Sequence, residues 1–385
     1  MNDIHALGLD LGTMFIQSAR DDGNGNVVYN TVRDCYRQID FDQEFEDTLK
    51  SQDARYVKDD KYIYVLGNDA YLQAGMAEFG ADMGHLEANE ILKRPMKDGI
   101  LNTDSPKMSI TILRELIKAC IEKDIGPARH GEVLYFSIPA NPIDSDINNS
   151  FHTKMAEQFL RGLGYDPHAL GEALALVYSE NPQMYTPDGP IPFTGITISL
   201  GAGQANFCLA ERGLPLDEFS IAKCGDWVDH NVARMVGQPK TKVLRVKEKE
   251  LDFDHIDETN PILLGLRCYY EELIEYIFSK FAKRFENNRG SIDHPIDLII
   301  SGGTANPPGI INLVNGVIDR MNLPFEIKEV KKAKDMFRSV ATGCYIRARQ
   351  LAKKQAAAKK IISEIENPEE VEKKSDKPKK GTNEK

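Results

Sequence analysis

One carboxylate and a Gly-Thr pair stand close together at the end of the first apolar run, "ALGLDL". Asp10 lies where this run ends, and Gly12 and Thr13 follow it in a turn before the next apolar run. Backbone N–H groups at a glycine turn can approach an anion closely, because no Cβ blocks them. A carboxylate beside such a turn can hold Mg²⁺ through water, since this ion dehydrates reluctantly. Asp10 is therefore a candidate magnesium-side residue, and the candidate phosphate contacts are Gly12, Thr13 and Met14.

Two further glycine turns follow apolar runs later in the sequence. "SLGAGQ" begins at Ser199 and leads into another apolar run, and "SGGT" begins at Ser301 and precedes a helical pattern. Two hairpin tips that face each other can clamp a polyphosphate, and the third turn can accept a flat nucleotide group against bare backbone. A single turn is unspecific, but the order hairpin, hairpin and strand–turn–helix is much more specific. The candidate contacts here are Gly201, Ala202, Gly203, Gln204, Gly302, Gly303 and Thr304.

Other motifs of phosphate binding or catalysis are missing from the sequence. It has no G-x-x-x-x-G-K-[ST], H-E-x-x-H or G-x-S-x-G, and "GAGQAN" fails the dinucleotide pattern at its last position. The eight histidines show no ligand spacing, and the six cysteines contain no C-x-x-C pair. A zinc site or a disulfide framework is therefore not expected. The cysteines are expected to be reduced thiols.

The size and charge of the chain limit its class. With 385 residues, 41% of them apolar, it is long enough for two or more lobes. Its formal net charge of −11 argues against a nucleic-acid partner. No apolar run approaches the ~20 residues of a membrane helix, and the start of the sequence does not read as a signal peptide. A cytoplasmic protein is expected.

The elements around the turns follow the same order in both halves. Residues 5–32 predict a β-meander, and the pattern of strand, glycine turn and strand restarts at 195. Residues 38–60 are charged and poorly periodic, which favours a loop or the variable edge of a subdomain. The last apolar-periodic helix is expected to end near 360, and the charged tail after it has the composition of a disordered segment.

This ordered set of segments resembles the actin/DnaK-type ATPase superfamily, and within it the bacterial actins of the MreB and MamK kind. "LGLDLGTMFIQSA", "ISLGAGQANFCLA" and "LIISGGTANPPGI" are similar to its first phosphate loop, second phosphate loop and adenosine loop. "RPMKDGIL", "SIPANP", "GEALALVYS", "AKCGDWVDHNVA" and "ATGCYIRA" match other segments of these proteins in the same order. The resemblance covers most of residues 5–352.

The resemblance implies an α/β, actin-like (ribonuclease H-like) duplicated fold, with a nucleotide cleft between two lobes. The implied core of lobe I comprises 1–32, 104–190 and 341–360, and its small subdomain 33–103. The implied core of lobe II comprises 191–226 and 294–340, and its small subdomain 227–293. Residues 361–385 form the charged tail.

The resemblance also implies a function. Such a protein binds ATP or ADP with Mg²⁺, hydrolyses ATP and polymerises head-to-tail with copies of itself. Glu172 matches the residue that orients the attacking water, together with Asp10 as the magnesium-side aspartate, and Lys247 lies in the helix that flanks the base and ribose. The tail is a candidate contact for adaptor or cargo proteins, and at most weak membrane contact is expected.

One position departs from the family pattern. The second phosphate loop of the family normally starts with an aspartate that helps to hold the magnesium waters, and here Ser199 stands in its place. Serine supplies no negative charge, so slow hydrolysis is expected. Two alternatives stay open: a catalytically weak structural homologue, and a nucleotide-dependent switch of the DnaK type. The short tail argues against the switch, because the DnaK class carries a long substrate-binding domain after the ATPase.

Overall fold

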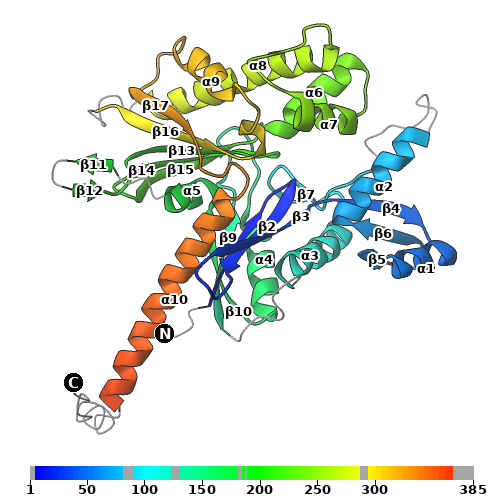
Figure 1. The fold of residues 1–385 in the computed structure, drawn as a ribbon, viewed down its shortest axis with the longest axis horizontal. Coiled ribbons are helices and arrows are strands. Elements are labelled where there is room, and N and C mark those ends of the chain that lie inside the picture. Colours follow the sequence, from blue (N-terminus) through cyan, green and yellow to red (C-terminus); the bar gives the residue numbers. More distant parts are fainter. Residues whose placement is uncertain are drawn as a thin grey trace, which may run out of the picture.

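Two five-stranded sheets dominate the computed structural model, which describes residues 5–80, 91–122, 131–180, 184–186, 189–286 and 294–366 (Figure 1). The strand order of the first sheet is β10 (Tyr165–Gly171), β9 (Glu132–Ile138), β1 (Ala6–Leu11), β2 (Phe15–Asp21) and β3 (Val27–Arg33). The strand order of the second is β17 (Ile327–Lys332), β16 (Ile296–Ser301), β13 (Gly195–Leu200), β14 (Ala205–Glu211) and β15 (Leu214–Ile221).

The two sheets have the same topology. In each, the first strand along the chain is central and begins an antiparallel meander on one side. On the other side it pairs in parallel with a later strand, which in turn pairs in parallel with the edge strand. Parallel strands need long crossovers, which here contain helices. The duplicated α/β fold with two lobes that the resemblance implied is thereby confirmed, whereas the division into four subdomains stays a prediction.

Helices cover the sheets and bury their apolar faces. In the first lobe, α3 (Pro106–Glu122) and α4 (Ser150–Gly162) pack on the first sheet. In the second lobe, the apolar core lies between the second sheet and helices α6 (Gly225–Val236), α7 (Lys240–Glu250), α8 (Pro261–Arg284) and α9 (Ile310–Ile318). The cross-strand pair Phe207 and Phe219 stacks at 4.7 Å in this core, which is the arrangement that stabilises paired strands.

A third sheet forms the outer part of the first lobe. It consists of β4 (Tyr36–Asp40), β6 (Tyr62–Leu66) and β5 (Tyr56–Lys58), with helices α1 (Gln43–Ser51) and α2 (Gly67–Gly80) beside it. The prediction of a loop over 38–60 was therefore wrong. Helix α1 begins there because the Asp42 carboxylate accepts a hydrogen bond from the N–H of Phe45 at 2.7 Å, while buried Leu49 anchors the helix.

Short elements complete the described chain. They are the ribbon β7 (Met96–Lys97) with β8 (Ile100–Leu101), the ribbon β11 (Met184–Thr186) with β12 (Gly189–Ile191), and the 3₁₀ turn η2 (Gly303–Ala305).

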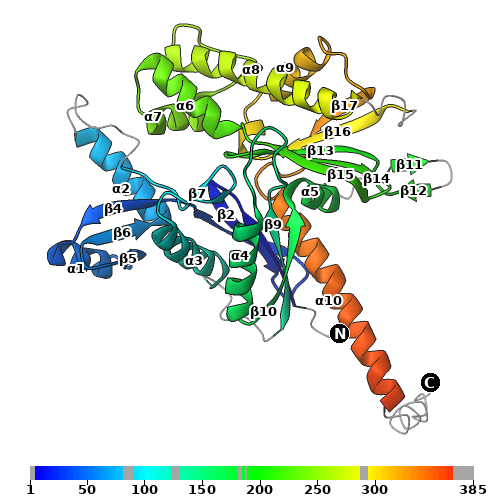
Figure 2. The ribbon, with the colours of Figure 1, turned by 180° about the vertical axis from the view of Figure 1, so that it is seen from behind.

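Two helices join the lobes at the centre of the molecule. Helices α5 (Glu172–Glu180) and α10 (Ser339–Glu366) pack against each other between the sheets, as the view from behind also shows (Figure 2). A Cβ on Gly343 of α10 would overlap the carbonyl oxygen of Ala175 in α5. The two helices therefore approach each other more closely than any residue larger than glycine permits.

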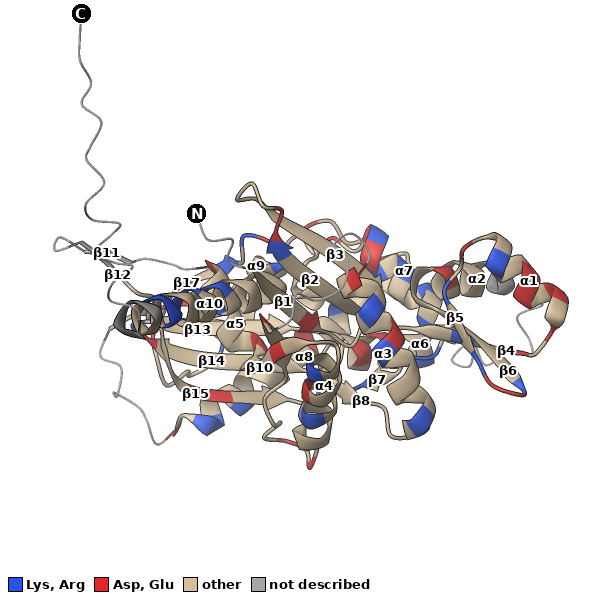
Figure 3. Ribbon diagram, turned by 90° about the horizontal axis from the view of Figure 1, so that it is seen from below, with Lys and Arg blue, Asp and Glu red and all other residues tan. Residues whose placement is uncertain are grey.

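Helix α10 is longer than the sequence predicted. It continues to Glu366, past the expected start of the tail, and projects from the body of the molecule (Figure 1). The rest of the predicted disordered tail lies outside the described residues. Seen from below, α10 and α1 lie at opposite ends of the molecule (Figure 3).

We predict that Gly343→Ala lowers the melting temperature by several degrees. The added methyl group would force α5 and α10 apart, and overpacking of this kind typically costs about 1–3 kcal/mol. Thermal unfolding followed by circular dichroism measures the effect. Gly316→Ala in α9 is the matched control, because a Cβ there meets nothing within 4 Å and should leave the melting temperature unchanged or slightly higher. Equal melting temperatures of the two variants would contradict the close contact.

Candidate functional site

A cavity of about 770 Å³ lies between the two lobes. Its walls come from the β1–β2 turn, the β13–β14 turn, the segment after β16, helix α7 and the start of α10. Every site residue predicted from the sequence lines it: Asp10, Gly12, Thr13, Met14, Glu172, Ser199, Gly201, Ala202, Gly203, Gln204, Lys247, Gly302, Gly303 and Thr304. The structure thus brings together in one place residues that are separated by up to about three hundred positions in the sequence.

The two hairpin turns have the same backbone geometry. The N–H of Gly12 donates to the carbonyl of Phe15 at 3.1 Å, and the N–H of Gly201 donates to the carbonyl of Gln204 at 3.1 Å. In the part of the chain that the structure describes, the N–H groups within the turns, those of Thr13, Met14, Ala202 and Gly203, donate to no protein acceptor. Backbone donors left without a protein acceptor suit an anionic ligand.

The two turns also touch through the segment between β7 and β8. The Thr13 hydroxyl accepts a hydrogen bond from the N–H of Gly99 at 3.1 Å, and the Gln204 side chain donates to the carbonyl of Asp98 at 2.6 Å. A Cβ on Gly203 would lie 2.5 Å from the Gly99 nitrogen. Glycine at this position is therefore required for the two turns to close on the same segment.

Asp10 lies at the end of β1, with its carboxylate beside the next parallel strand. Its Oδ1 accepts a hydrogen bond from the Ser137 hydroxyl at 2.7 Å, and that hydroxyl accepts from the N–H of Leu11 at 2.9 Å. Burial raises the pKa of Asp10 to about 6, against which the Ser137 hydrogen bond acts. The carboxylate is more enclosed than an acid at an exposed hairpin tip.

Glu172 begins helix α5 and reaches the same part of the cavity. Its Oε2 accepts hydrogen bonds from the Asn206 amide at 3.0 Å and from the Ser199 hydroxyl at 3.3 Å. Burial, and next the negative charge of Asp10, raise the pKa of Glu172 to about 8. Two carboxyl groups close enough to influence each other thus face one cavity, and neither forms an ion pair with a described lysine or arginine.

The third turn closes the other end of the cavity. Gly302 has a φ of +98° and donates its N–H to the carbonyl of Met336 at 2.9 Å, and the Thr304 hydroxyl donates to the carbonyl of Gly201 at 2.7 Å. Phe337 lines this end, with its ring 6.4 Å from that of Phe15. This region offers bare backbone and aromatic surface to a flat, apolar group.

Helix α7 forms the wall beside this third turn. The Lys247 ammonium forms an ion pair with buried Asp229 at 2.7 Å, so its position at the cavity is fixed from within the second lobe. Glu248 forms an ion pair at 3.4 Å with Arg33 of β3, across the cleft. The guanidinium of Arg33 also lies 3.9 Å from the centre of the Tyr71 ring in α2.

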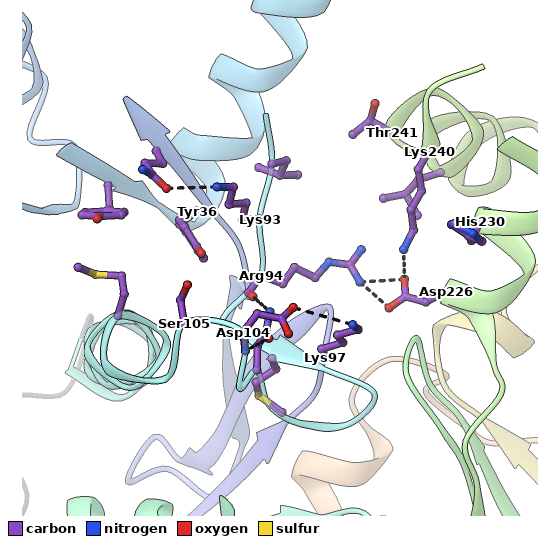
Figure 4. Close-up of a pocket in the computed structure, with 17 residues that line it drawn as sticks. Tyr36, Lys93, Arg94, Lys97, Asp104, Ser105, Asp226, His230, Lys240 and Thr241 are labelled. Carbon is purple, nitrogen blue, oxygen red and sulfur yellow. Dashed lines mark hydrogen bonds and ion pairs between the residues drawn. The ribbon is translucent and has the colours of Figure 1, made fainter. Parts of the chain in front are cut away.

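A second contact crosses the cleft farther out, in a neighbouring pocket of about 650 Å³ (Figure 4). Arg94 donates to both carboxylate oxygens of Asp226 at 2.8 Å, and Lys240 lies 3.1 Å from the same carboxylate. Although burial acts to raise the pKa of Asp226, the charges of Arg94 and Lys240 hold it well below its usual value. This ion pair, in which one Arg94 nitrogen contacts both oxygens of the carboxylate, joins the segment before β7 in the first lobe to α6 of the second.

Some residues of the site were not predicted as site residues. Ser137 orients Asp10 and Asn206 orients Glu172, while the side-chain Oδ1 of Asn206 accepts a hydrogen bond from the N–H of Ala140 at 2.9 Å. The sequence feature that could have identified them is a polar residue within an otherwise apolar strand. Such a residue is buried with the rest of the strand, as Ser137 and Asn206 are, and a buried polar side chain needs a partner. The pairing of Arg94 with Asp226 joins residues 132 positions apart and had no local signal.

Neither a preformed metal centre nor a membrane span is found among the described residues. No group of three or more histidine, cysteine or acidic side chains gathers there in an arrangement that could hold a metal ion. None of the described helices combines the length and the apolar composition that crossing a bilayer requires.

Several solved structures share this fold. A double-helical filament of MamK has a TM-score of 0.62 at 16% identity, covering 89% of this chain and 98% of MamK. MreB 5 of Spiroplasma citri bound to AMPPNP has a TM-score of 0.60 at 15% identity, and the match covers 93% of this chain and 100% of MreB 5. The ethanolamine utilization protein EutJ from Carboxydothermus hydrogenoformans has a TM-score of 0.51 at 17% identity, and the match covers 90% of this chain and 91% of EutJ. The fold is therefore actin-like.

Sequence comparison places the chain in a family. No curated protein matches its sequence. The family model described as volactin, however, matches residues 5–348, which is most of the chain and includes every residue of the cavity described above. The chain belongs to the volactin family.

Proposed function

We propose that this protein binds ATP with Mg²⁺ in the cavity between its lobes, assembles head-to-tail into filaments in the cytoplasm, and hydrolyses ATP slowly. The observation that carries the proposal is the convergence of three glycine turns and two carboxyl groups on one cavity between two sheets of identical topology. The related MreB 5 structure holds AMPPNP, and the related MamK structure is a double-helical filament.

Each part of the nucleotide has a proposed place. The N–H groups of the two hairpin turns bind the phosphates from opposite sides, because they have no described protein acceptor. The base lies at the third turn, against Gly302, Gly303 and the Phe337 ring. Lys247, held by Asp229, adds a positive charge at the cavity wall.

The pair Asp10 and Glu172 fits a divalent cation. Both residues are half-buried and have raised pKa values, and no described lysine or arginine neutralises them. A magnesium ion between these groups and the phosphates would supply that missing charge. Only two carboxyl groups are available, which suits an ion that keeps most of its water ligands.

Glu172 is the proposed water-orienting residue. Asn206 and Ser199 both donate to its Oε2, which leaves Oε1 to accept a hydrogen bond from water. In hydrolysis, the water oxygen forms a bond to the γ-phosphorus while the bond to the β–γ bridging oxygen breaks, and ADP leaves with that electron pair. The proton of the water passes to Glu172 or to phosphate, and then to solvent.

Ser199 distinguishes this site from the pattern of the superfamily that the sequence resembles. Its hydroxyl is buried and already donates to Glu172, so it contributes a hydrogen bond and no charge where an aspartate is expected. The missing charge supports slow hydrolysis and long-lived polymers. It also keeps open the second candidate function, a structural actin homologue that binds nucleotide with little turnover.

We predict that Asp10→Asn lowers the affinity for ATP–Mg²⁺ at least tenfold, about 1.4 kcal/mol. Asparagine retains an oxygen that can accept from Ser137, so the fold should persist while the charge is lost. Isothermal titration calorimetry measures the affinity, and circular dichroism checks the fold. Asp146→Asn, at an exposed position outside the cavity, is the control. Unchanged affinity in Asp10→Asn would exclude Asp10 from the site.

We predict that the nucleotide-free protein in EDTA becomes less stable as the pH rises from about 5 to about 8. The pKa values of Asp10 and Glu172 are raised in the folded state, to about 6 and about 8, so the stability present at low pH is lost as these groups ionise. Glu172→Gln should flatten the decrease in melting temperature, whereas Glu286→Gln, at an exposed site, should not. Identical pH profiles for Glu172→Gln and wild type would contradict the half-buried pair.

We predict that Ser199→Asp raises the rate of phosphate release tenfold or more while the affinity for ATP–Mg²⁺ stays similar. The substitution restores the carboxylate that normally helps to hold the magnesium waters, and Asp10 and Glu172 already supply the other two. Steady-state phosphate release and calorimetry are measured on wild type, Ser199→Asp and the uncharged control Ser199→Ala. Weaker binding without a gain in rate would mean that the new carboxylate only repels Asp10 and Glu172.

A further inference from the structure

The outer half of helix α10 is positively charged and projects away from the body of the molecule (Figure 1). From Ser339 to residue 362 the helix contains no acidic residue. Its exposed cations are Arg349, Lys353, Lys354, Lys359 and Lys360. Among the described residues, none of Lys353, Lys354 and Lys359 forms an ion pair with a carboxylate. Ile361 and Ile362 follow them and are more than half exposed.

The projecting helix presents a continuous surface. Arg349, Lys353, Ala357 and Lys360 follow one another at spacings of three and four, which places them along one side of the helix. On the inner side, Leu351 and Ala352 pack against the core beneath α10, and the Gln355 amide donates to Asp166 at 3.2 Å. The helix is therefore held in position while its cationic side stays accessible.

The outer edge of the third sheet carries the opposite charge. Over β4, α1 and β5 and the turns beside them, seven carboxylates are exposed (Asp40, Asp42, Glu44, Asp47, Asp53, Asp59 and Asp60), against four exposed cations, Lys50, Arg55, Lys58 and Lys61, so the edge carries a net negative charge. Of the seven carboxylates, Asp47 is the one that forms an ion pair with a described lysine or arginine, with Lys50 at 3.3 Å. Phe41 lies among them and is 40% exposed, so this acidic edge also offers an apolar contact.

The cationic helix and the acidic edge cannot meet within one molecule. Figures 1 and 3, which are related by a 90° turn, both place α10 and α1 at opposite ends. A second copy shifted along this direction, however, brings the acidic edge of one molecule beside the α10 of the next. Contacts between two different patches of identical subunits are heterologous and continue into an open polymer.

We propose that α10 of one subunit binds the acidic edge around α1 of the next subunit, and that this pairing fixes the head-to-tail register of the polymer. The inference rests on the filament assembly proposed above and adds the surfaces that form the contact. Opposite charges steer subunits into register, and like charges at the same place oppose it. Phe41 and the Ile361–Ile362 pair add apolar area to the contact.

The experiment exchanges the charges. Lys353→Glu/Lys354→Glu reverses the charge of α10, and Glu44→Lys/Asp47→Lys reverses the charge of α1. Both pairs are exposed, so the fold should persist, and glutamate and lysine have similar helix propensities. Lys107→Glu/Lys154→Glu, on exposed positions of α3 and α4, changes the net charge by the same amount as the α10 variant and is the control. Pelleting with ATP–Mg²⁺ over a range of protein concentrations gives the critical concentration of each protein.

Each charge-reversed variant should raise the critical concentration at least about tenfold, and the variant that combines all four substitutions should bring it back near the wild-type value. The control should assemble like wild type. Added salt should raise the critical concentration of wild type, because screening weakens the pairing.

Two results would overturn the proposal. The first is assembly of Lys353→Glu/Lys354→Glu at the wild-type concentration; if this variant also binds less well to vesicles that contain phosphatidylserine, α10 is a lipid-binding helix instead. The second is the absence of rescue in the combined variant. If wild type itself stays monomeric with ATP–Mg²⁺, the proposed filament function fails and the contact fails with it. If wild type assembles and the α10 variant assembles equally well, the filament function stands and only the proposed contact fails.

Discussion

The close approach of α10 to its neighbours determines how the two lobes are placed. A Cβ on Gly8 of β1 would overlap the backbone of α10 at Ala341 and Tyr345, and a Cβ on Gly343 would overlap α5 at Ala175. Two positions without side chains thus let α10 lie directly on a strand of the first sheet and on a helix that packs against the second. The hairpin turns that follow β1 and β13 face each other because of this arrangement, and the cavity depends on it.

Much of this organisation could be predicted from the sequence, because it depends on local patterns. The three glycine turns and the strands that precede them follow from apolar periodicity and turn residues, and the structure has all of them. The order of these segments carried the resemblance that implied the actin-like fold, although no single turn was specific. The fourteen predicted site residues line one cavity for the same reason, since each of the central hairpin turns ends at the cleft.

What could not be predicted depends on contacts between distant segments. Helix α1 lies in a charged stretch without clear periodicity, and it forms because Asp42 caps it and Leu49 is buried. The edge strand β10 contains Pro167, which is unusual within a sheet and tolerated at its edge. The roles of Ser137 and Asn206 follow from which strand lies beside which, and an amino-acid pattern does not reveal that. The end of α10 was placed too early because residues 361–366, with the sequence IISEIE, adjoin a charged segment and carry no clear helix stop signal.

The contacts across the cleft have a kinetic consequence. Three contacts join one lobe to the other around the cavity: Arg94 with Asp226, Arg33 with Glu248, and Asp98 with Gln204. A ligand enclosed behind them would leave only when all three are broken in the same opening event, so its residence time would exceed what any single contact gives. Affinity and dwell time are then separate properties, because a pair such as Arg94 with Asp226, which lies outside the cavity lining, can slow release without contributing to binding.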